Sequence, residues 1–327
     1  MRGPVAGVWS WHGLGAVLLQ CALAQLAAAQ VPPPQLNLHR LPPVGASAPV
    51  VVGEPGVIWE GGGFDPSLVL EREAWTWQLL PDGLIYRSYL AGVREPRIGV
   101  VWSDERGNGA LWDSTLGGRV GILRHGTQHP AHPEGWQLDI EGAAFPRLLT
   151  SVDRDLASVD FRFGVPLTYG AGPWSMKMAF YHLSSHLGDE FWEKNPDMSR
   201  VNYVRDALVW GVAYRPNDDW RLYAEAGWAF HMAGGAEPWE FQFGAEFSPA
   251  RANGFHGAPF LAVNAHLQEE VYFGGNLTAQ AGWQWRGADS GSLLRAGVQY
   301  FTGQSNQYQF FQRDSEQQIG AGLWYDF

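Results

Sequence analysis

From about residue 96 to the C-terminus, apolar and polar residues alternate with a period of two. About twelve such runs of roughly ten residues follow one another, separated by turn-forming residues. Successive side chains on a strand point to opposite faces, so each run would have one apolar and one polar face. Two representative apolar stripes are Val159, Phe161, Phe163, Val165, Leu167 and Leu277, Ala279, Ala281, Trp283, Trp285. The pattern predicts an all-β protein, a transmembrane antiparallel β-barrel of about twelve strands over residues 96–327.

The polar faces of these runs carry charges of both signs. Paired charges would fill a small barrel better than they would line an open pore. A soluble β-sandwich or soluble barrel with inward apolar stripes is the alternative. The aromatic residues cluster at the ends of the stripes, which favours the membrane form. Counts of about ten or about fourteen strands stay open, because the turn at 124–135 is long for a periplasmic one.

The C-terminus and the loop lengths predict how the barrel is oriented. Phe327 ends the chain after an alternating run, and this resembles the terminal signal by which the assembly machinery recognises bacterial outer-membrane barrels. With an even number of strands, both termini face the periplasm. The long connections at 185–199 and 302–315 would then lie outside the cell. The predicted localisation is the bacterial outer membrane, with membrane lipid and the barrel assembly machinery as partners.

The N-terminal part divides into three segments. Residues 1–29 read as a signal peptide, with Arg2, an apolar stretch and the small residues Ala27, Ala28 and Ala29 before Gln30. Residues 30–70 are a linker rich in Pro and Gly. Residues 71–95 are assigned to an N-terminal periplasmic segment, for which a plug or an extra hairpin is equally compatible with the sequence.

Composition narrows the partners further. The formal net charge of −11 argues against a nucleic-acid partner held through phosphates. The 17 Trp residues suit interfacial aromatic girdles. The single cysteine, Cys21, lies in the predicted signal peptide, so no disulfide is expected in the mature chain. Beyond that signal, the sequence contains no apolar run long enough for a transmembrane helix.

Polar residues interrupt the lipid-facing stripes of the fifth and sixth strands. Trp174, Met176, Met178 and Phe180 begin one stripe, which His182, Ser184 and His186 continue. Asn202 and Asp206 share the apolar face of the next strand, where a charge is costly. If Trp174 lies level with Tyr214, His182 falls opposite Asp206. A register shifted by two residues would instead set Ser184 against Asn202.

Either register gathers the groups that ester hydrolysis needs. Ser184 would be the nucleophile, His182 the base that takes its proton, and Asp206 or Asn202 the group that orients the base. Such residues are also common as rim polar groups, and His182 with Asp206 could simply close a hairpin. A metal site formed by His182, His186 and Asp189 or Glu190 is less compatible, since His residues four apart on a strand lie about 13 Å apart.

Two resemblances bear on the fold and the activity. The His182-Leu183-Ser184 sequence on an outward strand, with a polar partner on the next strand, resembles the active sites of outer-membrane phospholipase A and lipid A deacylase. Where the phospholipase family has Asn directly after Ser, this chain has Ser185, and the spacing from Ser184 to Asn202 is longer. The resemblance implies a lipid esterase, with calcium as a possible cofactor held by Asp189 and Glu190. No other cofactor is required.

The second resemblance is to an uncharacterised bacterial family, a domain of unknown function. It covers most of the mature chain through LPDGLIYRSYLAG from Leu80, YHLSSHLGDEF from Tyr181 and RVNYVRD from Arg200. It implies no activity. Two functions therefore stand: a hydrolase of outer-leaflet phospholipid or lipid A, and a non-enzymatic barrel acting as a narrow channel or a structural or surface protein. The oligomeric state stays open.

Overall fold

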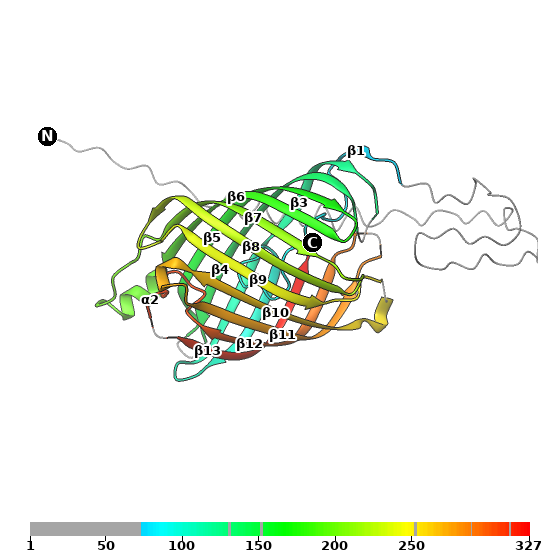
Figure 1. The fold of residues 1–327 in the computed structure, drawn as a ribbon. Helices are drawn as coiled ribbons and strands as arrows, with labels where there is room; N and C mark the ends of the chain where they lie inside the picture. The colour runs from blue at the N-terminus through cyan, green and yellow to red at the C-terminus, as the bar shows by residue number, and fades with distance from the viewer. Residues whose placement is uncertain (1–72, 130–131, 151–152, 252–253, 289, 314) are drawn as a thin grey trace, which may run out of the picture. The chain divides into compact units, whose positions relative to one another are not determined.

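The computed structural model describes residues 73–327 except 130–131, 151–152, 252–253, 289 and 314. The predicted signal peptide and linker lie outside the described residues. Within the described part, no helix is long and apolar enough to cross a membrane. The described chain is built almost entirely from antiparallel strands (Figure 1).

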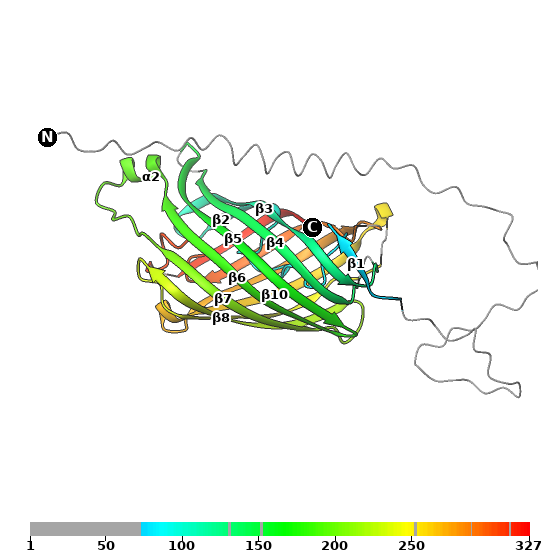
Figure 2. The same ribbon diagram turned by 90° about the horizontal axis from the view of Figure 1, so that it is seen from above.

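Twelve consecutive strands close into a barrel, because β2 pairs with both β3 and β13. Every neighbouring pair is antiparallel, and the strands run obliquely around the wall (Figures 1 and 2). The predicted fold is confirmed. The strands are β1 (Thr76–Leu79), β2 (Ile98–Glu105), β3 (Gly109–Gly126), β4 (Gly135–Leu149), β5 (Asp155–Ala171), β6 (Trp174–Leu187), β7 (Val204–Tyr214), β8 (Trp220–Ala233), β9 (Trp239–Phe247), β10 (Ala258–Gln268), β11 (Gly275–Arg286), β12 (Leu293–Gly303) and β13 (Glu316–Asp326). Three short helices lie in the connections: α2 (Asp189–Lys194), η3 (Gly254–His256) and η4 (Glu269–Val271).

The outer wall of the barrel is apolar. Side chains alternate between exposed and buried along most strands, and the large exposed side chains are nearly all Leu, Ile, Val, Met, Phe, Tyr and Trp. An apolar surface this large is stable only against lipid, which is why the alternating pattern specifies a membrane wall. Tryptophans gather toward both ends of this wall, with Trp136, Trp174 and Trp220 at one end and Trp102 and Trp228 toward the other.

The two ends of the barrel differ. The end that holds Ile98 and Tyr325, called here the terminal end, has short connections at 172–173 and 215–219. The opposite end, called here the loop end, holds the two longest connections, 188–203 and 304–315. The long turn expected at 124–135 spans only 127–134, because β3 and β4 pair as far as Gly126 and Gly135.

The lumen is lined by buried charges that pair across the wall. Such ions would be costly inside a barrel unless each had a partner of opposite sign. Arg119 binds Asp139 at 2.6 Å, and Lys177 binds Glu225 at 2.5 Å. Further pairs join Arg162 to Glu141, Arg221 to Glu246 and Arg295 to Asp326. The inward faces are therefore packed and neutralised, as their mixture of signs predicts.

For the segment before the barrel, the sequence left a periplasmic segment, a plug and an extra hairpin open. β1 pairs with β3 beside the terminal end, in line with β2, and its pairing continues as Leu80 N–H donates to Ile122 O. The chain then leaves the wall and returns at Arg97, whose carbonyl accepts from Gly117 N–H. Residues 81–96, called here the plug, run inside the barrel, with Tyr86, Tyr89 and others fully buried. Of residues 71–95, those from 81 onward are thus luminal, not a separate periplasmic segment.

Specific polar contacts hold the plug. Arg97 donates to the carbonyls of Leu90 (2.6 Å) and Tyr89 (2.5 Å), while Glu246 accepts from Leu90 N–H at 2.6 Å. The Tyr89 ring stacks on Tyr223 with centroids 3.8 Å apart, and its hydroxyl donates to Glu225. Because these partners lie on the inward faces of β8 and β9, the plug satisfies wall groups that would otherwise be buried alone.

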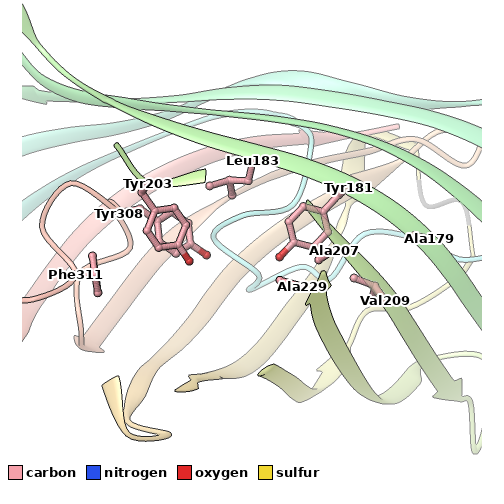
Figure 3. Packing of buried hydrophobic residues seen from close by; sticks show 9 residues of the cluster. All are labelled: Ala179, Tyr181, Leu183, Tyr203, Ala207, Val209, Ala229, Tyr308 and Phe311. Carbon is pink, nitrogen blue, oxygen red and sulfur yellow. The ribbon is translucent and has the colours of Figure 1, made fainter. Parts of the chain in front are cut away.

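The connection 304–315 folds back into the loop end of the lumen. Tyr308 stacks on Tyr203, and Phe311 packs beside them under Leu183 and its neighbours (Figure 3). This connection also bonds to the walls of β4–β6, as in Ser158 with Gln307 at 2.9 Å. The plug and this connection thus enter the lumen from opposite ends, and small cavities remain between them and the wall.

Arg147 is the ionic centre of the loop end, and its removal should be strongly destabilising. Its guanidinium binds Asp113 (2.7 Å), Glu316 (2.8 Å) and Asn306 (2.7 Å), and its side chain is 3 % exposed. Arg147→Ala leaves the carboxylates of Asp113 and Glu316 without their cationic partner and should lower the free energy of unfolding by about 3–5 kcal/mol. Urea unfolding in vesicles, followed by tryptophan fluorescence, measures the loss. The control Arg106→Ala, at an exposed turn, should change it by less than about 0.5 kcal/mol; equal losses would contradict the prediction.

Candidate functional site

β6 carries the polar residues that interrupt the lipid-facing wall. Its burial alternates without a break, so Trp174, Met176 and Met178 face outward and the residues between them face the lumen. The same parity continues through His182, Ser184 and His186. These three side chains therefore lie on the outer wall, toward the loop end.

The pairing of β6 with β7 brings His182 onto Asp206. Trp174 pairs with Tyr214, and the register then sets His182 directly opposite Asp206. Of the two registers considered, this is the one in which Asp206 is the partner. His182 Nδ1 and Asp206 Oδ1 lie 2.6 Å apart, a short charge-assisted hydrogen bond. The two side chains are 44 % and 21 % exposed, so the pair is open to the surroundings of the barrel.

A second histidine reaches the same carboxylate. His231 Nδ1 on β8 lies 2.9 Å from Asp206 Oδ2, so each oxygen of Asp206 bonds one imidazole. Strict alternation from Trp228 would turn His231 toward the lumen. The β7–β8 register shifts between Asp206 and Ala207, and this irregularity places Phe230 as an extra residue and turns His231 outward. Sequence periodicity missed His231 for this reason.

The remaining predicted site residues lie nearby without joining the pair. Ser184 is opposite Val204 on β7, two residues beyond His182 on the same face, and forms no hydrogen bond within the described residues. Asn202 is exposed and precedes β7, so it does not contact His182. His186 is exposed near the end of β6, with its ring 5.8 Å from that of Phe161.

Asp189 and Glu190 occupy the first turn of α2 and already have protein partners. Asp189 Oδ1 accepts from Arg200 at 2.7 Å, and Glu190 Oε2 accepts from Leu156 N–H at 3.2 Å. Among the described residues, no group of three or more His, Cys, Asp or Glu side chains could hold a metal ion.

Packing behind the site makes its wall rigid. Tyr181 and Leu183 are fully buried on the luminal side of β6 (Figure 3), next in sequence to the outward His182 and Ser184. Arg205, next to Asp206 on β7, is fully buried too. Tyr181 donates to Glu240, and Arg205 donates to the carbonyls of Glu237 (2.6 Å) and Pro238 (2.8 Å). Ordered luminal contacts of this kind hold the outward residues in a fixed arrangement.

The cluster lies at the level of the aromatic residues at the loop end. On β8, Trp228 pairs with Leu208, two residues from Asp206, and its other neighbour is Trp239 on β9. Tryptophan collects where headgroups meet acyl chains. The His182–Asp206–His231 cluster therefore lies at interfacial depth and not in the hydrocarbon core.

Comparison with known proteins defines the family. A family described as a protein of unknown function (DUF1207) matches residues 74–327. The chain belongs to this family. The match begins just before β1 and so covers the plug as well as the barrel. No curated protein matches this DUF1207 chain in sequence.

Solved barrels share its general form. The outer membrane phospholipase (OMPLA) dimer of Salmonella typhi with bound calcium is 11 % identical, with 71 % of this chain and 92 % of that chain covered and a TM-score of 0.45. Outer membrane phospholipase A from Escherichia coli is 11 % identical, with 71 % and 91 % covered and a TM-score of 0.44. The KdgM porin is 10 % identical, with 70 % and 99 % covered and a TM-score of 0.36. Phospholipase and porin appear together, so the function of the DUF1207 barrel has to be argued from its own site.

Proposed function

We propose that this DUF1207 barrel is a hydrolase of the bacterial outer membrane that cleaves acyl esters of outer-leaflet phospholipid or lipid A. The observation that carries the proposal is the 2.6 Å bond between His182 Nδ1 and Asp206 Oδ1 on the lipid-facing wall. Asp206 is a carboxylate on an otherwise apolar wall, and each of its oxygens bonds a histidine. A role in chemistry on lipid accounts for its position.

The orientation follows from the two ends of the barrel. The longer connections at the loop end suit the cell exterior, and the terminal end suits the periplasm. The site at the loop end then faces the outer leaflet, at the depth where ester groups lie.

The geometry supplies a base with a defined tautomer. Because Asp206 accepts from Nδ1–H of His182, Nε2 is left as the acceptor for the Ser184 proton. Ser184 is on the same face two residues away, about 7 Å along the strand, so the His182 ring has to turn along the strand for Nε2 to reach the short serine side chain. Proton transfer requires the hydroxyl to come within about 3 Å of Nε2, a contact that often forms only when substrate is bound.

The proposed reaction has two steps, acylation of Ser184 and hydrolysis of the acyl-serine. Ser184 Oγ attacks the acyl carbonyl carbon while its proton moves to Nε2 of His182, and Asp206 stabilises the imidazolium. The tetrahedral intermediate expels the alcohol oxygen of the lipid, which takes that proton. Water repeats the sequence on the acyl-serine, releasing a fatty acid and restoring Ser184.

A channel is the less favoured function, because two segments of the chain lie in the lumen and the luminal charges are paired. A conducting pore needs an open path lined by one sign of charge. In the described residues the plug and the 304–315 connection occupy the lumen, and its charges form pairs of opposite sign. A structural barrel would have no use for the lipid-facing His182–Asp206–His231 cluster.

The proposal predicts lipid ester hydrolysis by the purified protein. The barrel, refolded into vesicles of radiolabelled phospholipid or of lipid A, should release fatty acid in proportion to the amount of folded protein. Thin-layer chromatography identifies the product and the substrate class. The same protein left unfolded in urea before dilution is the control. Release no faster from the folded than from the unfolded sample, with both lipids, would refute hydrolysis.

A further inference from the structure

The terminal end of the barrel contains a pocket that the proposed hydrolysis does not use. It is open to solvent, and the empty space within it, open solvent included, is about 690 Å³. Four segments far apart in the chain line it with basic side chains: Arg87 from the plug, His132 from the 127–134 connection, Arg215 from the 215–219 connection and Arg286 from the end of β11. The pocket lies at the opposite end from the His182–Asp206–His231 cluster.

The acidic residues around this pocket are largely engaged elsewhere. Glu246 accepts from Leu90 N–H and pairs with Arg221 at 3.4 Å. Asp326 pairs with Arg295 at 2.8 Å and with Arg97 at 3.3 Å. The remaining acids, Asp218 and Asp219, lie in the rim connection, and the Asp218 side chain is 75 % exposed.

Two of the arginines keep an unneutralised charge. Arg286 donates to neutral acceptors: the carbonyls of Pro249 (3.2 Å) and Gly291 (3.3 Å) and the hydroxyl of Ser248 (2.9 Å). Within the part of the chain that the structure describes, neither Arg286 nor Arg215 forms an ion pair. A guanidinium held by neutral groups at the wall of a cavity retains its full attraction for an anion.

The pKa values of His132 and Arg215, which lie in two of the connections, also indicate a positively charged pocket. Burial and, after it, the charges of Arg215 and Arg87 lower the pKa of His132 to about 3, so its ring is neutral. Neither ring nitrogen of His132 has a hydrogen-bond partner among the described residues. Burial and then the charge of Arg221 lower the pKa of Arg215 to about 10. The pocket is therefore electropositive and holds unused polar atoms.

We propose that this pocket binds a phosphate group, through Arg87, Arg215 and Arg286, at the periplasmic mouth of the barrel. The planar fork of a guanidinium matches two oxygens of a phosphate, and converging forks from separate segments favour a multiply charged oxyanion over a chloride ion. The phosphate could belong to a free solute or to the headgroup of an inner-leaflet phospholipid. The chemistry of recognition is the same for both sources.

Titration calorimetry on the refolded full-length barrel in neutral detergent tests the site, with inorganic phosphate as the probe. A second arm measures phosphorus-31 line broadening of a phosphatidylglycerol dispersed in the same detergent. Wild type should bind one of the two probes saturably. The Arg87→Gln/Arg215→Gln variant should bind it at least about tenfold more weakly, since charge-assisted bonds are lost. Arg251→Gln, at the same end but outside the pocket, should bind like wild type.

The two arms distinguish the two sources of phosphate. Saturation by inorganic phosphate identifies a solute site, and saturation by the lipid alone identifies a headgroup site. Absence of saturable binding in both arms, or equal affinities for wild type and the double variant, would overturn the proposal. Heat-modifiable migration on gels confirms that each variant is folded.

Discussion

Replacing Ser184 with Ala should lower lipid ester hydrolysis by at least about 10⁴-fold, to the rate that the site gives without a nucleophile. The serine hydroxyl forms the bond to the acyl carbon, so no neighbouring group can replace it. The folded barrel should be unaffected, because Ser184 faces outward and forms no hydrogen bond in the described structure. Fatty acid release from vesicles and urea unfolding, measured on the same preparations, separate activity from stability.

The adjacent serine provides a matched control. Ser185 points into the lumen, where its hydroxyl accepts from Gln309 at 3.2 Å. Ser185→Ala should therefore reduce stability modestly and leave hydrolysis near the wild-type rate. If Ser184→Ala and Ser185→Ala hydrolyse lipid equally, Ser184 is not the nucleophile.

The two histidines on Asp206 extend the same experiment. Asp206→Ala removes the group that fixes the His182 tautomer and should cost about 10²- to 10⁴-fold in activity. His231→Ala leaves the His182–Asp206 bond in place and should cost about tenfold or less, as expected for coupling through a shared carboxylate. A larger loss for His231→Ala than for His182→Ala would make His231 the base.

Strand parity explains how much of the site could be read from the sequence. The stripe from Trp174 to Phe180 fixes which face of β6 meets lipid, and matching its aromatic end to Tyr214 fixes the register with β7. From those two facts the contact between His182 and Asp206 follows for one of the two registers considered, and the observed pairing of β6 with β7 selects that register. The catalytic roles of these residues stay a prediction.

Irregular backbone explains what the sequence could not show. The extra residue at Phe230 reverses parity from His231 to the end of β8, and nothing in the local sequence marks a bulge there. The plug has no periodicity, so its place depends on partners such as Glu225 and Glu246 that lie far away in the chain. The sequence shows that these partners are acidic, but it does not show which segment of the chain would lie between them.

The two internal segments should decide whether the barrel conducts ions, and removing both should convert a closed barrel into a pore. Leu80 and Arg97 bond to Ile122 and Gly117 of β3, five residues or about 17 Å apart, so a Gly/Ser linker of about eight residues can replace the plug. The 304–315 connection can likewise be shortened to a tight turn between β12 and β13.

Planar-bilayer recordings should then show a stepwise result. Wild type should give no steady conductance, because both halves of the lumen are filled. Plug replacement alone should give little, since Tyr308, Phe310 and Phe311 still close the loop end. The double replacement should give stable ohmic steps, because the exposed luminal charges become hydrated and hold a water column open. Wild-type conductance equal to that of the double replacement would reverse the assignment and make the channel the function of this barrel.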